Sequence, residues 1–337
     1  MFAAGCMLRE GTVLLSVDAL RVTYPVRWGW PIPKTFLLKA VDGVSFSVSK
    51  GEALGIVGES GCGKSTVARA ILRLVEPEDG RIIFNGTDIT RMPTRQLRQL
   101  RPKLQMIFQD PAASLSPRMR IGTALAEVIR VHKIAEGEAA KDLIETALSE
   151  VGLSPDAANR FPHEFSGGQK QRIGIARALV LSPKLIIADE PVSALDVSVQ
   201  AQILNLMARL KKERGIAFVF ISHDLGVVRH FCEQTAVMYL GQLIEHGETR
   251  AIFDTPVHPY SRLLRSVSPV PDPNAPSVTV LLEGEPPSPL DPPNGCRFHP
   301  RCPFVADRCR SEVPALRPAV SRLVACHFAE TLPPPEV

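Results

Sequence analysis

Short apolar runs without alternation indicate the strands of this chain. Ala53–Val57, Leu185–Ala188 and Ile216–Ile221 are uniformly apolar, which is typical of strands buried on both faces of a sheet. Between the last two runs, apolar residues recur at helical spacing from Val199 to Leu210, and Gly215 suits the cap that ends a helix. A strand, a helix and a second strand in this order predict a βαβ unit with parallel strands.

Two further patterns divide the chain into parts. Residues 110–180 carry helical patterns and are expected to form an inserted helical lobe. Eighteen of the 30 prolines lie after residue 255, and proline interrupts both helices and sheets. We therefore place the core at residues 12–255 and a loop-rich extension at residues 256–337. The predicted fold class is α/β, with a partly parallel sheet, an inserted α-helical subdomain and this C-terminal extension.

Composition narrows the class of protein only a little. The length of 337 residues suits a core with an appendage, and 45% hydrophobic with 22% charged residues is ordinary for a globular protein. The formal charge of +4 gives no reason to expect a nucleic-acid partner. No apolar run approaches the ~20 residues of a spanning helix, and the first residues do not resemble an export signal. We expect the protein to stay in the cytoplasm and to reach a membrane only through partner subunits.

A glycine-rich loop supplies the clearest chemistry. It follows the run that ends at Val57, opens a predicted helix, and matches the phosphate-loop pattern G-x-x-x-x-G-K-[ST]. The glycines let successive backbone N–H groups point at phosphates near the start of a helix. Lys64 is expected to contact the β- and γ-phosphates, and the Ser65 hydroxyl to bind Mg²⁺. The loop and the residue after it, predicted to bind ATP, are Gly58, Glu59, Ser60, Gly61, Cys62, Gly63, Lys64, Ser65 and Thr66.

Polar residues follow two of the predicted strands at the edge where open α/β sheets bind their ligands. Asp189 and Glu190 end the run that begins at Leu185, and adjacent side chains on a strand point in opposite directions. Asp189 therefore suits the Mg²⁺ shell, and Glu190 suits the orientation or deprotonation of an attacking water. His223 follows the next strand and is placed to contact the γ-phosphate. These residues predict a site for ATP hydrolysis.

Together these motifs resemble the ATP-binding-cassette (ABC) ATPases, which implies a P-loop nucleotidase core. The resemblance implies that a Ser-Gly-Gly-Gln turn caps the γ-phosphate held by a second ATPase subunit, so that two cassettes enclose two ATP molecules. It also implies that Gln109 contacts Mg²⁺ or the attacking water, that Asp196 belongs to the D-loop, and that Tyr24 stacks on adenine. Trp28 and Trp30 lie near Tyr24, so a role in packing the turn is open for all three aromatic residues. The residues of the Ser-Gly-Gly-Gln turn are Ser166, Gly167, Gly168 and Gln169.

Four of the seven cysteines lie within the last 42 residues, with the spacing C-x₅-C-x₆-C-x₁₆-C. In a reducing compartment such a cluster favours metal binding over disulfides. The gaps are longer than the pairs of structural zinc sites, and four thiolates suit a [4Fe–4S] cluster. Zinc and unligated thiols stay open as alternatives. Nearby arginines, Arg297, Arg301, Arg308 and Arg310, suit either the charge of a bound cluster or a solvated surface. The four cysteines are Cys296, Cys302, Cys309 and Cys326.

The extension resembles that of ATPase subunits of oligopeptide and dipeptide importers, which also serve some nickel uptake systems. The segments that carry this likeness are 109–118, 258–262 and 284–289, and the insert near Tyr24 is most similar to the second of two related ATPases. The resemblance implies a subunit at the cytoplasmic face of the membrane, in a heterodimer with a second ATPase. Its further partners would be two transmembrane permeases and an extracytoplasmic solute-binding protein. Nickel or another solute as cargo, a homodimer, and a non-transport ABC ATPase remain alternatives.

Overall fold

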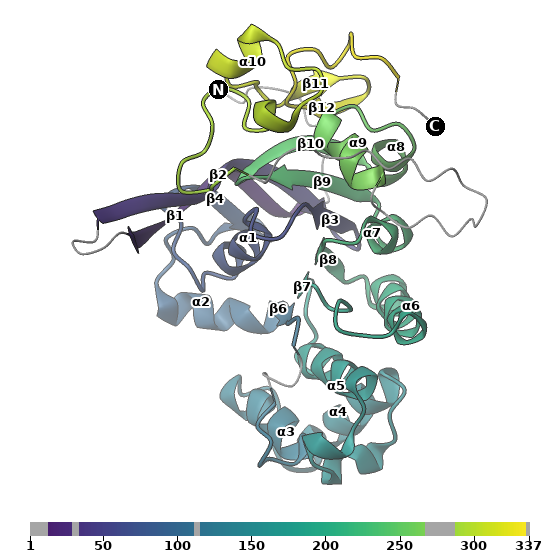
Figure 1. The fold of residues 1–337 in the computed structure, drawn as a ribbon. Helices are drawn as coiled ribbons and strands as arrows, with labels where there is room; N and C mark the ends of the chain where they lie inside the picture. The colour runs from purple at the N-terminus through teal and green to yellow at the C-terminus, as the bar shows by residue number, and fades with distance from the viewer. Residues whose placement is uncertain (1–12, 29–33, 111–114, 267–286, 335–337) are drawn as a thin grey trace. The chain divides into compact units, whose positions relative to one another are not determined.

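A computed structural model describes residues 13–28, 34–110, 115–266 and 287–334 of the chain (Figure 1). Trp30, and parts of segments 109–118 and 284–289, lie outside these residues. The chain divides into two compact units. We call residues 1–49, 53–91 and 222–337 the phosphate-loop unit, and residues 50–52 and 92–221 the helical unit.

The phosphate-loop unit contains an antiparallel sheet of order β2-β1-β4-β5. A long hairpin of two 16-residue strands, β1 and β2, forms one side of this sheet, and Tyr24 lies opposite Leu38 in that hairpin. Alternate residues along the second half of β2 are buried, so one face of the hairpin packs into the unit. The strands are β1 (Val13–Trp28), β2 (Lys34–Ser49), β4 (Asp79–Phe84) and β5 (Thr87–Asp88).

A second run of strands in the same unit has the order β11-β12-β10-β9-β3. Strands β3 and β9 are parallel, whereas β9, β10, β12 and β11 pair in antiparallel fashion. The predicted, partly parallel sheet is therefore confirmed. Its two last strands come from the extension, so this loop-rich segment adds to the core sheet (Figure 1). The bounds are β3 (Ala53–Val57), β9 (Gln234–Tyr239), β10 (Gln242–Glu248), β11 (Arg317–Ala319) and β12 (Arg322–Val324).

Short helices complete the phosphate-loop unit. Helix α1 begins at Lys64, directly after the glycine-rich loop, as the motif predicts. Helices α7 and α8 contact each other, and α8 contacts β10. The helices are α1 (Lys64–Ile71), α7 (Leu225–Phe231), α8 (Thr249–Asp254), α9 (Pro259–Ser266) and α10 (Asp307–Ser311), with a 3₁₀ turn η4 (His299–Arg301).

The helical unit contains the predicted βαβ arrangement. Strand β7 (Leu185–Asp189) is parallel to β8 (Ala217–Ser222) and to β6 (Leu104–Ile107). Helix α6 (Val197–Arg214) joins β7 to β8 and buries the apolar side chains of its stripe. It ends at Gly215, whose φ of 63° is the left-handed conformation that glycine accepts at a helix end.

Most of the predicted helical lobe is helical in the structure. Besides α6, the helices described in this unit are α2 (Thr94–Leu100), α3 (Ile121–Val131), α4 (Gly137–Glu150) and α5 (Gly167–Leu179), with 3₁₀ turns η1 (Arg101–Lys103), η2 (Pro155–Asn159) and η3 (Pro162–Glu164). Helix α3 contacts both α4 and α5. No helix within the described part of the chain is long and apolar enough to cross a bilayer.

A buried ion pair fastens the extension to the phosphate-loop unit. Glu245 on β10 is fully buried and accepts hydrogen bonds from the backbone N–H groups of Val257 and His258. Its partner Arg322 on β12 lies 3.1 Å away and also donates to the backbone oxygen of Ala251. A carboxylate without such partners would be costly to bury, so the two ends of the extension depend on each other.

We predict that Arg322→Met lowers the free energy of unfolding by about 3–5 kcal/mol, because it leaves the Glu245 carboxylate buried without its cation. Arg229→Met is the control, since the Arg229–Asp254 pair is more than half exposed and costs at most about 1 kcal/mol when removed. Urea unfolding followed by circular dichroism measures both changes. Equal, small losses for the two variants would contradict the anchoring role of Arg322.

Candidate functional site

The loop between β3 and α1 has the geometry of a phosphate-binding loop. The Lys64 side chain is 5% exposed, and its ammonium lies inside the loop. Its Nζ donates to the backbone oxygens of Gly58, at 2.7 Å, and Glu59, at 2.9 Å. Ser65 and Thr66 follow in the first turn of α1, both half-buried. An anion in this loop would meet a helix N-terminus and a fixed positive charge.

Two glycines allow the loop to fold this closely. Gly58 has φ 155° and Gly63 has φ 106°. A Cβ atom on Gly58 would overlap the backbone oxygen of Met238, and a Cβ on Gly63 would overlap that of Ala40. Since both obstacles are backbone atoms of neighbouring strands, they cannot move aside as a side chain can. Glycine is therefore required at these two positions by packing as well as by backbone angle.

The helical unit holds a second group of polar residues, centred on Glu190. The amide of Gln109 donates to the Glu190 carboxylate at 3.1 Å and lies 3.5 Å from the Ser193 hydroxyl. Ser193 in turn donates to the backbone oxygen of Glu190 at 3.1 Å. Gln109 therefore contacts the carboxylate of Glu190, and Ser193 contacts its backbone. Ser193 was not predicted as a site residue from the sequence, although it lies three residues before Asp196.

The backbone at Glu190 differs from the simple alternation that the sequence suggests. Strand β7 ends at Asp189, which is 8% exposed, and Glu190 has φ 48°. Its N–H donates to the backbone oxygen of Ile221, the neighbour on β8, at 3.0 Å. A left-handed conformation at a non-glycine residue is strained and persists only where the surroundings impose it. The two carboxylates are therefore separated by a backbone turn rather than by strand alternation.

The Ser-Gly-Gly-Gln turn starts helix α5. Ser166 accepts a hydrogen bond from the Gln169 N–H at 3.3 Å, and the Gln169 side chain accepts one from the Ser166 N–H at 3.0 Å. This reciprocal pair is a capping box, a signal of helix initiation that was also readable in the sequence. Gly168 lies against Val199 of α6, where a Cβ would be too close. Ser166 and Gly167 remain exposed, so the start of α5 is open to another molecule.

The other predicted residues are distributed over the two units. The phosphate-loop unit contains Tyr24, half-buried on β1, and His223, exposed after β8. The helical unit contains Asp196, which is exposed and precedes α6. The predicted phosphate-loop residues therefore lie in one unit, whereas Gln109, Glu190 and the Ser-Gly-Gly-Gln turn lie in the other.

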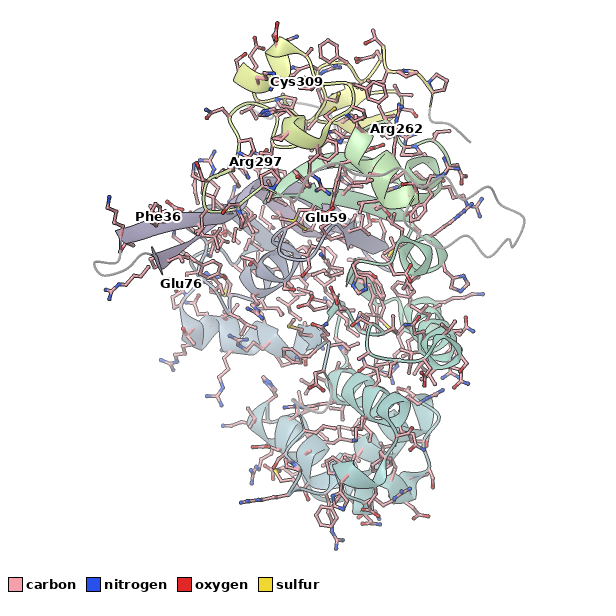
Figure 2. The ribbon with its side chains drawn as sticks, viewed as in Figure 1. Phe36, Glu59, Glu76, Arg262, Arg297 and Cys309 are labelled. Carbon is pink, nitrogen blue, oxygen red and sulfur yellow. The ribbon has the colours of Figure 1, made fainter. Side chains whose placement is uncertain are left out.

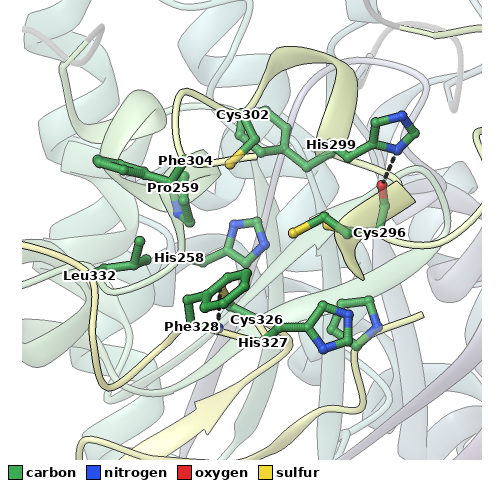
Figure 3. Close-up of a pocket in the computed structure, with 13 residues that line it drawn as sticks. His258, Pro259, Cys296, His299, Cys302, Phe304, Cys326, His327, Phe328 and Leu332 are labelled. Atoms are coloured by element: carbon green, nitrogen blue, oxygen red, sulfur yellow. Dashed lines mark hydrogen bonds between the residues drawn. The ribbon is translucent and has the colours of Figure 1, made fainter. Parts of the chain in front are cut away.

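The four clustered cysteines line a single pocket in the extension (Figure 3). The pocket is otherwise mainly aromatic and apolar, and His258, near the start of the extension, also lines it. The Cys296 N–H donates to the backbone oxygen of Cys309 at 2.8 Å, which ties two of the four together. The spacing of the cysteines in sequence did not predict which other residues would enclose them. The phenylalanines that share the pocket are Phe298, Phe304 and Phe328.

Each of these phenylalanines stands two residues after a cysteine. The Phe328 N–H donates to the sulfur of Cys326 at 3.4 Å. Burial raises the pKa values of Cys296 and Cys302 to about 11, and backbone hydrogen bonds from Phe298 and Phe304 oppose the rise. The repeated Cys-x-Phe pattern is thus a signal in the sequence, overlooked in its analysis, that supplies an amide and a ring at three of the four sulfurs.

The four cysteines are candidate metal ligands because they line one pocket. Within the described ranges, no three His, Cys, Asp or Glu residues are arranged to hold one metal ion. Four thiols nevertheless surround one pocket, and backbone amides are directed at the sulfurs of Cys296, Cys302 and Cys326. In iron–sulfur proteins, hydrogen bonds to sulfur and solvent exposure help to set the reduction potential of the cluster. Burial lowers the pKa of His258 to about 3, so this pocket residue is neutral.

Family models match both parts of the chain. A model described as ABC transporter matches residues 41–193, which include the phosphate loop, Gln109 and Glu190. A second model, described as oligopeptide/dipeptide transporter, C-terminal region, matches residues 244–309, which include three of the four cysteines.

Curated proteins match over almost the whole chain. The oligopeptide transport ATP-binding protein OppF of Salmonella typhimurium is 48% identical, over 95% of this chain and 97% of the relative. The probable peptide ABC transporter ATP-binding protein y4tS of Sinorhizobium fredii is 52% identical, over 93% of this chain and 89% of the relative. Among solved structures, the ATP-binding cassette MJ0796, a dimer bound to ADP and Pi after hydrolysis, has a TM-score of 0.62 at 28% identity. That match covers 70% of this chain and 99% of the cassette.

We predict that Gly63→Ala abolishes ATP binding, because the new methyl group would displace the loop from Ala40. Gly86→Ala is the matched control: Gly86 also has positive φ, 78°, but its Cβ would meet no atom within 4 Å. The control should bind ATP normally and lose only about 1 kcal/mol of stability through backbone strain. Fluorescence anisotropy with a labelled ATP measures binding. Normal binding by the Gly63 variant would refute the close-packing argument.

Proposed function

This chain belongs to the ATP-binding proteins of ABC transporters, and we propose that it drives the import of oligopeptides or dipeptides across the cytoplasmic membrane. The observation that carries the proposal is the 48% identity to an oligopeptide transport ATP-binding protein over 97% of that relative. The match to the C-terminal region of oligopeptide/dipeptide transporters supports the same cargo class. As a member of this family the chain is an ATPase, and its peptide substrate is the proposed part.

We propose that ATP binds along the phosphate-loop unit. Tyr24 stacks on the adenine, Lys64 contacts the β- and γ-phosphates, and Ser65 holds Mg²⁺. The backbone of the loop, from Gly58 to Thr66, surrounds the phosphates. Lys64 supports this role because its ammonium already lies at the centre of the loop, held by two carbonyl oxygens that phosphate would replace.

Hydrolysis needs an activated water, and Glu190 is its proposed base. Gln109 holds one oxygen of this carboxylate and is placed to position the water or the metal. Asp189 completes the Mg²⁺ shell, and His223 contacts the γ-phosphate. The strained backbone of Glu190 supports this assignment, since strain of this kind collects at functional positions.

A second ATPase subunit supplies the missing contacts to each ATP in this proposal. Ser166, Gly167, Gly168 and Gln169 lie at the start of α5, where the helix dipole is positive. In the proposal they contact the nucleotide bound to the partner subunit. Asp196 belongs to the same interface. Two membrane permeases and an extracytoplasmic binding protein complete the importer, and this subunit lies at the cytoplasmic face of the membrane.

We also propose that the extension, residues 256–337, holds a [4Fe–4S] cluster. Cys296, Cys302, Cys309 and Cys326 would supply the four thiolates, and the Cys-x-Phe amides would stabilise their charge. When bound, such a group supplies a rigid covalent link between four parts of a segment that has little core of its own. The core at residues 12–255 and its helical subdomain near 110–180 form the remaining proposed domains.

We predict that Glu190→Gln keeps ATP binding but lowers ATP turnover by at least about 100-fold, since removal of a general base costs 10²–10⁴-fold. Glu213→Gln, an exposed carboxylate near the end of α6, is the control. Both are assayed in the complex with the membrane subunits, by phosphate release and by uptake of a labelled oligopeptide into vesicles. The Glu190 variant should stop both signals, and the control neither.

Two results would count against these assignments. Normal phosphate release by Glu190→Gln would refute the base. Uptake of labelled nickel without uptake of peptide would refute the cargo while leaving the ATPase assignment intact.

We predict that anaerobically purified protein contains about four irons and four sulfides per chain, as one [4Fe–4S] cluster requires. Cys302→Ala should lower the iron content, whereas Cys232→Ser should not, since Cys232 lies outside the pocket. Colorimetric iron and sulfide analysis measures both. One equivalent of zinc without iron would overturn the cluster in favour of a zinc site.

A further inference from the structure

Two residues that are remote in sequence form hydrogen bonds with the phosphate loop. The backbone N–H of Glu59, the second residue of the loop, donates to the hydroxyl of Tyr260 at 2.8 Å. The carboxylate of Glu59 accepts hydrogen bonds from both terminal nitrogens of Arg301, each at 3.1 Å. Tyr260 and Arg301 belong to the extension, and Figure 2 shows Glu59 on the side of the core that faces it. One loop residue is therefore fixed by both its backbone and its side chain.

A carboxylate in this loop is a liability for ATP binding. The Glu59 side chain is 29% exposed and follows the first glycine of the motif, so an unpaired charge there would repel a triphosphate. The paired guanidinium of Arg301 is only 4% exposed, which weakens solvent screening of the interaction. A bidentate pair also fixes the direction of the carboxylate. Arg301 thus both neutralises Glu59 and determines where it points.

The arginine itself is held in place. Its guanidinium donates hydrogen bonds to the carboxylate of Glu59 and to the hydroxyl of Tyr239. Tyr239 lies 3.4 Å from the guanidinium and packs against Tyr260, with ring centroids 4.6 Å apart. Arg301 is therefore not part of a solvated surface, and it pairs with the phosphate loop.

The same residues adjoin the cysteine pocket. Arg301 directly precedes Cys302. The ring of Phe298 packs against those of Tyr239 and Tyr260, with centroid distances of 5.4 and 5.5 Å. His258 accepts a hydrogen bond from the Tyr260 N–H at 3.0 Å through its Nδ1 atom. Both Phe298 and His258 line the pocket. The contacts thus run from the cysteines through one layer of aromatic rings to Glu59.

We propose that Arg301 and Tyr260 are positioning residues for ATP binding, acting through Glu59 of the phosphate loop. Arg301 neutralises the negative charge of Glu59, which would otherwise repel the phosphates. Tyr260 fixes the loop backbone at the same residue. The extension is thereby part of the nucleotide site without touching the nucleotide. The inference rests on the proposed role of the loop in binding ATP.

Binding of labelled ATP to the full-length chain tests the proposal. Arg301→Met should raise the Kd for ATP about tenfold, as expected for loss of a charge-assisted pair. Arg301→Lys, which keeps the charge but not the fork, should raise it less. Tyr260→Phe should raise it by about threefold through loss of one neutral hydrogen bond. Arg308→Met is the matched control, because Arg308 also precedes a cysteine but pairs with Glu312 at the surface.

A double variant separates the electrostatic role from a merely structural one. When Glu59 is replaced by Gln, no charge remains for Arg301 to neutralise. Adding Arg301→Met to Glu59→Gln should therefore change the Kd by less than about twofold. Thermal melts establish that each variant is folded, and if Arg301→Met does not fold, Arg301→Lys and Tyr260→Phe decide the matter.

Distinct outcomes refute the inference and the function on which it rests. An unchanged Kd in folded Arg301→Met and Tyr260→Phe would overturn the positioning role. It would also be overturned if Arg301→Met weakened ATP binding equally with Glu59 present and with Glu59 replaced by Gln. A merely structural defect does not depend on the charge of Glu59. Lys64→Ala tests the loop itself: normal ATP binding by that variant would instead overturn the proposed nucleotide site.

Discussion

Close approach of backbone to backbone around the phosphate loop is the constraint on which the site depends. Gly58 and Gly63 lie against carbonyl oxygens of Met238 on β9 and Ala40 on β2, where no side chain fits. The two strands thus set the shape of the loop, and the Lys64 ammonium lies at its centre. A loop whose backbone N–H groups are to face an anion cannot pair them all within itself, so the neighbouring strands must hold it in shape.

The extension also helps to hold the phosphate loop, although it has little regular structure. Its strand β12 joins β10, and the Glu245–Arg322 pair fastens both ends of the segment to the core. Arg297 makes a further ion pair with Asp42 on β2, close to the strand residues that support the loop. Hence a segment whose prolines predict an appendage is integrated into the phosphate-loop unit through charged contacts and one added hairpin.

The candidate hydrolytic residues follow a different principle. In the helical unit, Glu190 is held by the side chain of Gln109, by Ser193, and by a strained backbone at the end of β7. Phosphate binding depends on backbone N–H groups and one lysine, whereas water activation depends on a carboxylate with a fixed direction. These two halves of the chemistry belong to separate compact units of one chain. An ATPase of a transporter, which has to couple chemistry to movement, benefits from such a division.

Much of the fold and the core of the site could be predicted from the sequence, because strand burial, helix periodicity and the phosphate loop are local patterns. The βαβ unit, the start of α1 at Lys64 and the end of α6 at Gly215 follow from residues next to one another. Strand alternation did not predict the turn at Glu190, since the hydrogen bond to Ile221 comes from another strand. The contact of Arg301 with Glu59 joins residues 242 positions apart, and no local pattern encodes it. The sequence by itself determined the elements and the type of chemistry; only tertiary structure decided which distant side chains hold the loop, because charge pairing at long range depends on where the whole chain packs.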